Sequence, residues 1–384
     1  MISRYRRLLR LPEQSFFLLG LRGVGKSTWA GEVLPDATHI DLLEERLYQD
    51  LLANPSLFSQ AIRRLAPGSW VVVDEVPRLP GLLNEVHRWM ERRRLRFALL
   101  GSSVRKLRAA GVNLLAGRAL PRTMFPLTAS ELGSDFELDT VLRYGSVPLI
   151  WTSPSRTDAL EAWALFYLQE EIRAEAAARN LAGFARFLPV AALMNGQVVN
   201  VSGIARDTGV ARSTVRGFLE ILEDTLVAFR LAGYDSRGRV RERRAPKLYW
   251  IDPGIVRAVQ RRRGPLTAEE RGPLFESWIL TTLRAHAADH DLFHTLSYWQ
   301  VHQRKTEVDF LLERSGDLLG IEAKATDRYH SGLLRGLRAL NRLRRVVRRI
   351  LVYTGDRSFR SSDGIRIWPA TRFAARVAAG ALWP

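Results

Sequence analysis

The sequence of 384 residues contains no cysteine, which excludes disulfide bonds, thiolate zinc sites and cysteine nucleophiles. It has only seven histidines, and they form no cluster that would suggest a zinc centre. No run of about eighteen apolar residues occurs, so no segment is expected to span a membrane. The basic start is not followed by an apolar segment, so we expect no secretory signal and predict a cytoplasmic location.

The sequence has few acidic residues relative to basic ones: it contains 40 aspartates and glutamates but 58 lysines and arginines, so the formal net charge is +18. Arginine dominates, in runs such as Arg92–Arg96, Arg241–Arg244, Arg261–Arg263 and Arg342–Arg349. Such an excess favours a polyanionic partner, and nucleic acid is the commonest one. The alternative is that arginines simply fill solvent-exposed helix faces. On charge and motifs together, we expect a DNA partner, either duplex or branched.

The most informative segment runs from Phe16 to Thr28 and reads FFLLGLRGVGKST. An apolar strand leads into G-x-x-x-x-G-K-S and then into a helix-compatible stretch, which is the context that a phosphate-binding loop needs. The glycines let successive N–H groups point at one anion, and the helix N-terminus adds positive charge. Lys26 is expected to reach the terminal phosphates of ATP, and Ser27 to hold Mg²⁺. The predicted nucleotide-binding residues are Gly20, Gly23, Val24, Gly25, Lys26, Ser27 and Thr28.

Helical segments and short apolar strands alternate after this loop. The alternation predicts a parallel sheet covered by helices on both faces. Ligands then bind at the carboxyl ends of the strands. The further strands are expected at Thr38–Leu42, Trp70–Glu75, Phe97–Leu100 and Ala119–Phe125.

Polar side chains stand at the ends of two of these strands. Asp74 is expected to hold Mg²⁺ through water, and Glu75 to orient or deprotonate the attacking water. A pair of acids that merely caps a strand end is the alternative interpretation. Ser102, or Ser103 beside it, ends the next strand and is expected to contact the terminal phosphate, although serines are also common in turns.

These motifs resemble those of the AAA+ P-loop ATPases. More narrowly, the chain resembles the prokaryotic and archaeal ATPases that carry a winged helix and a PD-(D/E)xK nuclease-like C-terminal domain. The resemblance covers nearly the whole chain and is carried in its first part by Gly20–Thr28, Val72–Glu75, Leu100–Ser103, Leu115–Arg118 and Phe125–Glu131.

The resemblance to AAA+ proteins implies a homo-oligomeric ring, expected to be a hexamer, with ATP held between neighbouring subunits. It also implies that Arg118 is an arginine finger that completes the neighbour's site, with Arg122 as the alternative residue. Such an arginine compensates phosphate charge in the transition state. A structural salt bridge is the other interpretation of Arg118.

The middle region contains a segment with the spacing of a helix-turn-helix, from Val201 to Val215 with Gly209 in the turn. Val227–Leu231 is expected to form a wing strand. DNA contact is one interpretation, and packing against a neighbouring domain is the other. Helices are also expected at Ala159–Asn180 and Phe184–Asn195. The residues expected to face DNA, as on a recognition helix, are Arg212, Ser213, Thr214 and Arg216.

The C-terminal region contains a predicted hairpin, Glu307–Leu312 and Leu318–Lys324, with its turn centred between Ser315 and Gly316. This register sets Asp309 opposite Glu322, with Cβ atoms roughly 5 Å apart. Two carboxylates at that distance suit one divalent metal. A hairpin whose acids pair with nearby basic side chains is the alternative.

The hairpin resembles the PD-(D/E)xK nuclease-like fold, with Glu276, Asp309, Glu322 and Lys324 at its four motif positions. The resemblance implies that Asp309 and Glu322 bind Mg²⁺ and that Lys324 stabilises the attacking hydroxide. It further implies that Glu276, near the start of an amphipathic helix, helps through water or a second metal. Domains of this type also serve as structural or DNA-binding platforms, so cleavage does not follow from the residues alone.

Taken together, these features predict an α/β protein of three domains. They are an AAA+ P-loop parallel-sheet domain at 1–150, a helical and winged-helix domain at 151–240, and a restriction-endonuclease-like α/β domain at 241–384. The first functional hypothesis is an ATP-hydrolysing motor that processes DNA. The alternatives are an ATP-dependent and Mg²⁺-dependent DNA nuclease, and a nucleotide-dependent regulatory switch that binds a protein partner.

Overall fold

The computed structural model describes residues 5–103, 117–167, 180–234, 245–301 and 306–384. The chain divides into two compact units: Met1–Phe125 with Glu220–Val227 belong to the first, and most residues from Pro126 onward belong to the second. The domain boundaries predicted at residues 150 and 240 stay predictions.

The first unit contains a five-stranded sheet in which every pair of neighbouring strands runs parallel. The strand order is β2-β3-β4-β1-β5, so β1 lies inside the sheet between β4 and β5. The β-branched and aromatic strand residues are buried, as is usual where helices cover a parallel sheet. The strands are β1 (Phe16–Leu19), β2 (Thr38–Asp41), β3 (Trp70–Asp74), β4 (Arg96–Gly101) and β5 (Leu120–Thr123).

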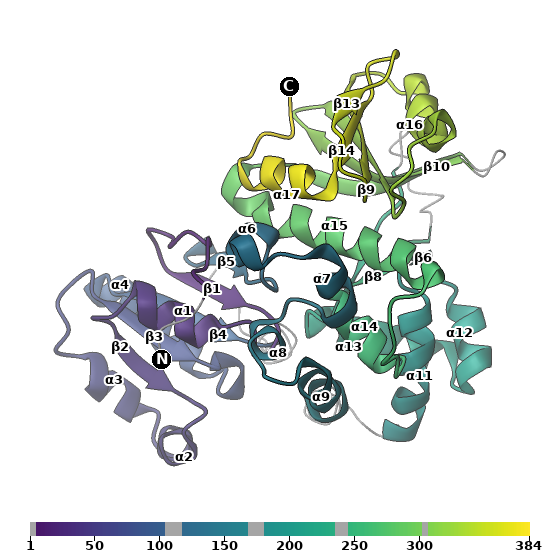
Figure 1. Ribbon diagram of the computed structural model, residues 1–384. Coiled ribbons are helices and arrows are strands. Elements are labelled where there is room, and N and C mark those ends of the chain that lie inside the picture. Colours follow the sequence, from purple (N-terminus) through teal and green to yellow (C-terminus); the bar gives the residue numbers. More distant parts are fainter. Residues whose placement is uncertain (1–4, 104–116, 168–179, 235–244, 302–305) are drawn as a thin grey trace. The chain divides into compact units, whose positions relative to one another are not determined.

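Short helices connect these strands (Figure 1). One apolar cluster joins the helices to the sheet. Its buried members include Phe58, Val71, Val73 and Leu99. The strand predicted at Ala119–Phe125 is confirmed as β5. The helices are α1 (Lys26–Val33), α2 (Glu45–Ala53), α3 (Ser56–Ile62), the 3₁₀ turn η1 (Val76–Arg78) and α4 (Leu82–Arg93).

The second unit begins with helices and a three-stranded antiparallel sheet in the order β6-β8-β7. The strand predicted at Val227–Leu231 is confirmed as β7, and it pairs with a strand that lies beyond residue 240; its role as a wing stays a prediction. The strands are β6 (Gln197–Val198), β7 (Ala228–Leu231) and β8 (Lys247–Trp250). The helices are α6 (Ala129–Leu132), η3 (Gly133–Asp135), α7 (Leu138–Tyr144), α8 (Pro148–Trp151), α9 (Arg156–Ala162), η4 (Trp163–Tyr167), α11 (Leu181–Leu193), α12 (Val201–Thr208), α13 (Arg212–Asp224) and α14 (Pro253–Val259).

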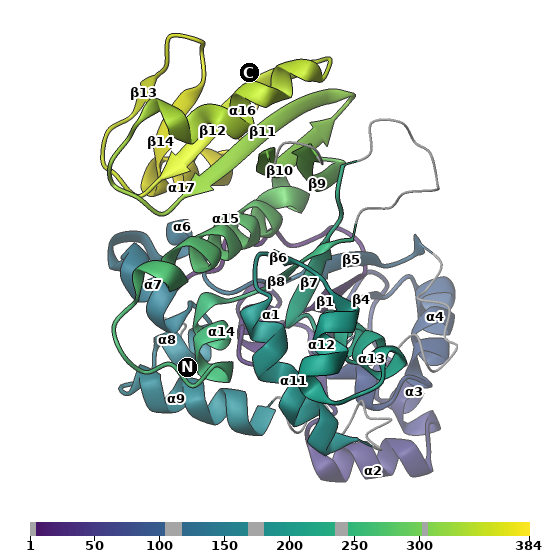
Figure 2. The same ribbon diagram turned by 90° about the vertical axis from the view of Figure 1, so that its right-hand side faces the viewer.

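A six-stranded mixed sheet completes the second unit, in the order β13-β14-β12-β11-β10-β9. Figure 2 shows α15 and α17 on one side of this sheet and α16 on the other. Its strands are β9 (Thr295–Val301), β10 (Thr306–Arg314), β11 (Asp317–Lys324), β12 (Val346–Tyr353), β13 (Phe359–Arg360) and β14 (Arg366–Pro369). Its helices are α15 (Ala268–His290), η5 (Ser331–Leu334), α16 (Arg335–Ala339), η6 (Leu340–Arg342) and α17 (Ala370–Ala378).

The helical structure predicted over Ala159–Asn180 is confirmed for residues 159–167, but not as one regular α-helix. The α-helix α9 ends at Ala162, and a π-helix follows it. Trp163 is buried but Phe166 is 62% exposed, so the apolar stripe on which the prediction depended does not face one core. Residues 168–179 of that prediction lie outside the described residues.

Two boundaries in the C-terminal region also differ from expectation. The sequence of Val346–Tyr353 predicts a basic helix end followed by a strand, but the whole segment is strand β12, paired on both sides. The segment Gly272–Glu276 predicts the start of an amphipathic helix, but helix α15 begins earlier, at Ala268, because Thr267 and Glu270 form a capping box there. Helix α17 was not predicted.

Candidate functional site

The glycine loop after β1 has the backbone conformation that its sequence predicts. Gly23 and Gly25 have φ values of 87° and 89°, in the left-handed region that favours glycine. At Gly20 a Cβ atom would lie 2.6 Å from the carbonyl oxygen of Met124, so no larger residue fits there. The loop leaves the carboxyl end of an internal strand, where parallel α/β sheets bind ligands.

Lys26 closes this loop onto itself. Its side chain is only 7% exposed, and its Nζ donates hydrogen bonds to Gly20 O at 2.7 Å and Leu21 O at 3.1 Å. Helix α1 starts at Lys26, and its first turn holds no acidic residue that would neutralise the positive end of the helix dipole. The lysine therefore sits beside the backbone N–H groups that would receive an anion.

Ser27, which follows Lys26 in the chain, lies close to Asp74. Ser27 lies close enough to Asp74, at the end of β3, for its hydroxyl to lower the pKa of that carboxyl group. Burial raises the pKa of Asp74, the Ser27 hydroxyl opposes this, and the charges of Asp41 and Glu75 raise the pKa further. A hydroxyl oxygen and a carboxylate oxygen are ligands that Mg²⁺ accepts, so these two residues are able to hold it, directly or through water.

Glu75 lies beside Asp74 in an unusual backbone conformation. Its φ is 53°, in the left-handed region, which costs a non-glycine residue of the order of 1–2 kcal/mol. Ser102 Oγ donates to Glu75 Oε1 at 2.8 Å, and Ser102 itself is 4% exposed. The strained residue is thus held by the end of the neighbouring strand β4, and strain of this kind is concentrated at functional sites.

The two arginines proposed as trans-acting residues have surface positions. Arg118 Nε pairs with Glu91 Oε1 at 2.7 Å, with the arginine side chain 44% exposed. Arg122 lies on β5 and donates weakly to the carbonyl of Pro121, at 3.5 Å. Within one chain Arg118 forms the structural ion pair that was its alternative interpretation, and its role toward a neighbouring subunit stays a prediction.

The helix-turn-helix segment consists of α12 and α13, joined through Gly209, whose φ is 66°. Arg212, Ser213 and Arg216 are exposed on α13, whereas Thr214 is half-buried. On its other face α13 packs Phe218 against Phe184 and Phe187 of α11. The exposed residues are placed to contact a ligand, and DNA contact stays a prediction.

The C-terminal hairpin has the predicted register. Arg314 pairs with Asp317 around the Ser315–Gly316 turn, and the ladder runs to Phe310 opposite Ile321. The next pair in this register is Asp309 and Glu322, which are 5% and 6% exposed. Asp309 Oδ2 accepts the N–H of Ala323 at 2.8 Å, and Lys324 Nζ contacts Glu322 Oε1 at 2.7 Å.

A β-bulge interrupts the regular alternation of side chains along β10. The pairing of β10 with β9 shifts between Val308 and Leu311, and both of these residues pack in the same apolar cluster. In a regular strand, residues three apart face opposite sides. Asp309 lies inside the bulge, and bulges are known to re-aim side chains near functional sites.

Glu276 of α15 lies close enough to Asp309 to feel its charge. Burial, together with the Asp309 charge, raises the pKa of Glu276 to about 8, although Lys247 and Lys324 oppose the shift. Burial and the Asp309 charge also raise the pKa of Glu322 well above its ordinary range. The acids and lysines of three elements therefore form one electrostatic unit, the carboxylate cluster of Glu276, Asp309, Glu322 and Lys324.

Sequence reasoning missed two residues that strand β8 brings to this cluster. Tyr249 OH donates to Glu276 Oε2 at 3.1 Å. Lys247, which is 4% exposed, forms an ion pair with Glu307. Burial lowers the pKa of Lys247, but the charges of Glu276, Asp309 and Glu307 raise it by more. The alternation of polar and apolar residues in 247–250 was the available signal, but nothing local linked it to a hairpin sixty residues away.

A metal ion fits this cluster in part. Within the described residues, no three or more histidine, aspartate or glutamate side chains are arranged as a set of metal ligands. One oxygen, Glu322 Oε2, is nevertheless buried without a hydrogen-bond partner among the described atoms. Buried carboxylate oxygens are normally satisfied, so this atom is available to a cation. Asp309 and Glu322 therefore provide two carboxylate ligands, which by themselves form an incomplete metal site.

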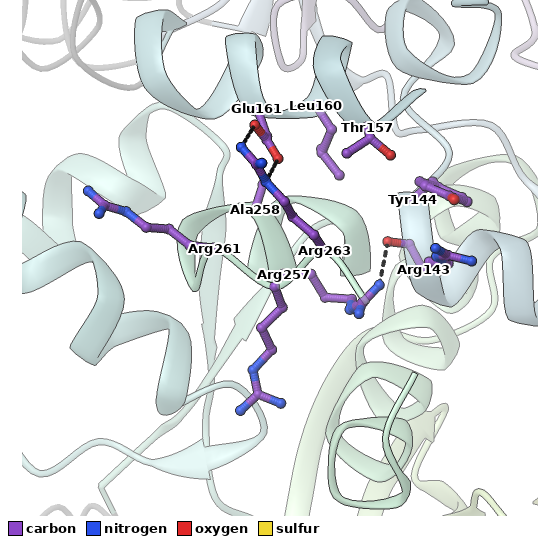
Figure 3. A pocket seen from close by; sticks show the side chains of 10 residues that line it. Arg143, Tyr144, Thr157, Leu160, Glu161, Arg257, Ala258, Arg261 and Arg263 are labelled. Atoms are coloured by element: carbon purple, nitrogen blue, oxygen red, sulfur yellow. Dashed lines mark hydrogen bonds and ion pairs between the residues drawn. The ribbon is translucent and has the colours of Figure 1, made fainter. Parts of the chain in front are cut away.

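A separate arginine-lined pocket lies in the second unit, between α7, α9 and the end of α14 (Figure 3). Its cavity volume is about 20 Å³, room for little more than a water molecule. Its arginines are largely paired: Arg257 donates to Glu270 at 2.9 Å, and Arg263 pairs with Glu161 at 2.5 Å. The pocket is therefore a structural ion-pair network, too small for a nucleotide.

Comparison with known protein families agrees with the first site. Residues 12–133 match the family model described as an AAA domain. This match supports an AAA-type P-loop ATPase domain, in line with the parallel sheet and the glycine loop. Residues 135–266 and 271–373 match two domains of unknown function, DUF8612 and DUF4143.

The proteins to which this chain is similar do not indicate its function. The uncharacterized proteins Rv2008c of Mycobacterium tuberculosis and Mb2031c of Mycobacterium bovis are each 29% identical over 386 residues, which cover 96% of this chain and 82% of the relative. Among solved structures, protein VC1899 from Vibrio cholerae matches with a TM-score of 0.24 and 14% identity, covering 95% of this chain and 96% of that one. PCH-2 of C. elegans matches with a TM-score of 0.25 and 14% identity, covering 56% and 62%. Scores this low carry no argument. In the described part of the chain, no helix has both the length and the apolarity needed to cross a bilayer.

Proposed function

We propose that this protein is an ATP-hydrolysing motor that processes DNA. The observation that carries the proposal is the convergence of three groups in the first unit. Lys26 lies against the glycine loop, Ser27 lies close to Asp74, and Glu75 is held by Ser102. Lys26 and Ser27 follow the carboxyl end of β1, whereas Asp74 with Glu75 and Ser102 stand at the carboxyl ends of β3 and β4. In the sheet β3 lies next to β4, and β4 lies next to β1, so these three strand ends are adjacent.

Each group has a defined task in this proposal. The loop N–H groups and Lys26 bind the phosphates, and Ser27 with Asp74 holds the magnesium ion. The bound ion supplies charge neutralisation at the phosphates. Glu75 orients the attacking water and accepts its proton, while the Ser102 hydroxyl fixes the carboxylate. Because Glu75 keeps a strained backbone, its carboxylate is already positioned before the nucleotide arrives.

The substitution Glu75→Gln tests the hydrolytic role. It keeps the side-chain length and an oxygen acceptor for Ser102, but removes the base. ATP binding should be retained, and phosphate release should fall about 10²–10⁴-fold. The matched control is Glu44→Gln, an exposed acid of the same unit, which should turn over ATP like the wild type. Unchanged turnover in Glu75→Gln would remove Glu75 from the mechanism.

The ring and its trans arginine belong to the same proposal. Arg118 would leave Glu91 and enter the neighbouring subunit's site, since an exposed ion pair contributes only about 0–1 kcal/mol. Mixing Lys26→Ala with Arg118→Ala protein is the test, because a mixed ring contains some interfaces with both residues intact. Partial recovery of ATP turnover is expected, and two inactive proteins that stay inactive when mixed would argue against a site shared between subunits.

DNA would bind the second unit through the exposed residues of α13, with α11–α13 and the sheet β6-β8-β7 acting as a winged helix. The support is the exposure of Arg212 and Arg216 beside a buried apolar face. Arg212→Gln with Arg216→Gln should weaken binding of a fluorescent duplex in an anisotropy titration. Wild-type affinity in the double variant would leave α13 with a packing role only.

A second candidate function is Mg²⁺-dependent cleavage of DNA by the carboxylate cluster. The unpartnered, buried Glu322 Oε2 beside Asp309 and Lys324 favours it. Asp309→Asn should abolish cutting of plasmid DNA in Mg²⁺ or Mn²⁺ while ATP turnover persists. Asp327→Asn, an exposed acid after the same hairpin, is the control. No cutting by the wild type in either metal would leave the motor without a nuclease.

A further inference from the structure

Five arginines gather at one edge of the six-stranded sheet, where β14 leads into α17. The guanidinium carbons of Arg366, Arg372 and Arg376 lie 5.8, 5.9 and 6.0 Å from the ring centre of Trp368. Arg348 of β12 and Arg360 of β13 are close enough to shift the pKa values in this group. We call these residues the Trp368 arginine cluster: Arg348, Arg360, Arg366, Arg372 and Arg376.

Among the described residues, no carboxylate forms an ion pair with any member of this cluster. Arg348 instead donates to the carbonyls of Leu382 and Trp383, the latter at 2.7 Å. Arg376 Nε donates to Ala381 O at 3.1 Å. These carbonyls fix two side chains in place but neutralise none of the charge.

The arginines therefore repel one another. Burial, with the charges of Arg366, Arg376 and Arg360, lowers the pKa of Arg348 to about 10. Burial and the neighbouring arginines also lower the pKa of Arg366. Like charges held close together destabilise the folded chain, and an anionic ligand would remove that cost.

Several other arginines of the second unit are matched by acids. Arg271 pairs with Asp139 at 2.6 Å, Arg338 with Asp363 at 2.9 Å, and Arg345 with Asp317 at 2.7 Å. The pocket of Figure 3 likewise contains Glu161 among its arginines, and two of those arginines, Arg257 and Arg262, pair with Glu270. The Trp368 arginine cluster differs from these paired arginines, because it gathers several guanidinium groups around one ring and no member has an acidic ion-pair partner among the described residues.

We propose that the Trp368 arginine cluster binds the sugar–phosphate backbone of nucleic acid. The proposal rests on the DNA partner of the proposed function and assigns it a second contact surface besides α13. Arg360 and Arg372 are exposed and Arg366 and Arg376 are half-buried, so all four reach solvent above the buried Trp368. Guanidinium groups bind phosphate oxygens in pairs of hydrogen bonds.

The upper limit on the size of the cluster allows contact with more than one phosphate. Three guanidinium carbons lie within 6.0 Å of one ring centre, so any two of them are at most twice that distance apart. Duplex DNA carries a charge about every 1.7 Å along its axis, so more than one phosphate lies within a span of that length. Backbone contacts position a protein without reading the base sequence.

The double variant Arg360→Gln with Arg372→Gln tests the proposal. Both residues are exposed, and removing repelling charges should leave the unfolding midpoint equal or raise it. Arg328→Gln with Arg335→Gln is the matched control, because it removes two exposed arginines near η5 and α16. The full chain is titrated onto a fluorescent 20-base-pair duplex at several salt concentrations, and anisotropy gives the affinity.

In the wild type, affinity should fall steeply with salt, and in the double variant the log–log slope should be smaller by about 2. With equal affinity extrapolated to 1 M salt, that change corresponds to about 100-fold weaker binding at 0.1 M. The control variant should retain the wild-type slope. A double variant with the slope and affinity of the wild type, or a control that loses as much, would overturn the proposal.

Two further results separate this proposal from the ATPase. If the wild type binds no duplex at any salt concentration, the nucleic-acid site is refuted, and basal ATP turnover of the same preparation still reports on the glycine loop independently. The double variant should keep that basal turnover. If polyglutamate displaces the duplex as effectively as unlabelled DNA does, the cluster binds acidic protein and the proposal is wrong.

Discussion

Asp252 provides a stability prediction whose magnitude follows from its surroundings. The side chain is 0% exposed and caps α14 by accepting the N–H of Ile255 at 3.2 Å. It also accepts the N–H of Ser146, between α7 and α8, at 2.7 Å. Burial raises the pKa of Asp252 from 3.8 to about 6, even though these backbone hydrogen bonds lower it.

The sign follows from the direction of the shift. Because the folded pKa lies above the unfolded value, the folded state holds the proton more tightly than the unfolded chain does. The stability that Asp252 contributes in this way is complete below pH 3.8 and is lost as the pH rises through 6. The difference between 3.8 and 6 corresponds to about 3 kcal/mol.

Asp252→Asn removes this titration and isolates it from all other groups. The asparagine offers one carbonyl oxygen, so the Ser146 N–H loses its acceptor at a pH-independent cost of about 1–3 kcal/mol. Urea unfolding of both proteins from pH 4 to pH 7 measures the difference in free energy of unfolding. The variant should be most destabilised at pH 4 and recover by about 2–3 kcal/mol by pH 7. A difference that stays constant with pH would refute the assignment to Asp252.

Two further substitutions test local features of the fold. Thr267→Ala removes the capping box with Glu270 and should cost about 1 kcal/mol, seen as a lower unfolding temperature; an unchanged temperature would show that the cap is dispensable. Gly20→Ala places a Cβ 2.6 Å from Met124 O and should reduce ATP affinity in a nucleotide titration. Gly31→Ala, whose Cβ meets nothing within 4 Å, is the control, and equal affinity in both variants would contradict the tight-loop argument.

The first site was predictable because its determinants are local. The strand before Gly20, the glycine spacing and Lys26-Ser27 lie within one short segment, and β-branched residues mark the strand that ends at Asp74. Parallel strands end at the same edge, so the meeting of Ser27 with Asp74 follows from the sheet. The strain at Glu75 was not predictable, because it arises from the turn into η1.

The second site was predictable only within its hairpin. The turn at Ser315–Gly316 sets a ladder that runs to Phe310 opposite Ile321, and Asp309 just beyond it accepts the N–H of Ala323. Lys247 and Tyr249 arrive from β8, whose position depends on tertiary packing that no local pattern encodes. The bulge around Asp309 is likewise a product of pairing with β9.

The basic C-terminal segments misled the sequence interpretation for a related reason. A run of arginines ahead of Val352 suggested an exposed helix end, but pairing with β11 and β14 makes it a central strand. Arg348 is 9% exposed there, held by the carbonyls of the last residues. The cluster around Trp368 combines residues of four elements, so it exists only in the folded chain.

The account depends most on the glycine loop binding ATP and on Glu75 promoting its hydrolysis. The most direct measurement is the initial rate of phosphate release from Mg²⁺-ATP by the purified full chain, with and without duplex DNA, compared with Lys26→Ala protein. The account predicts turnover by the wild type that requires Mg²⁺ and disappears in the variant. A wild type that releases no more phosphate than Lys26→Ala under both conditions would contradict it.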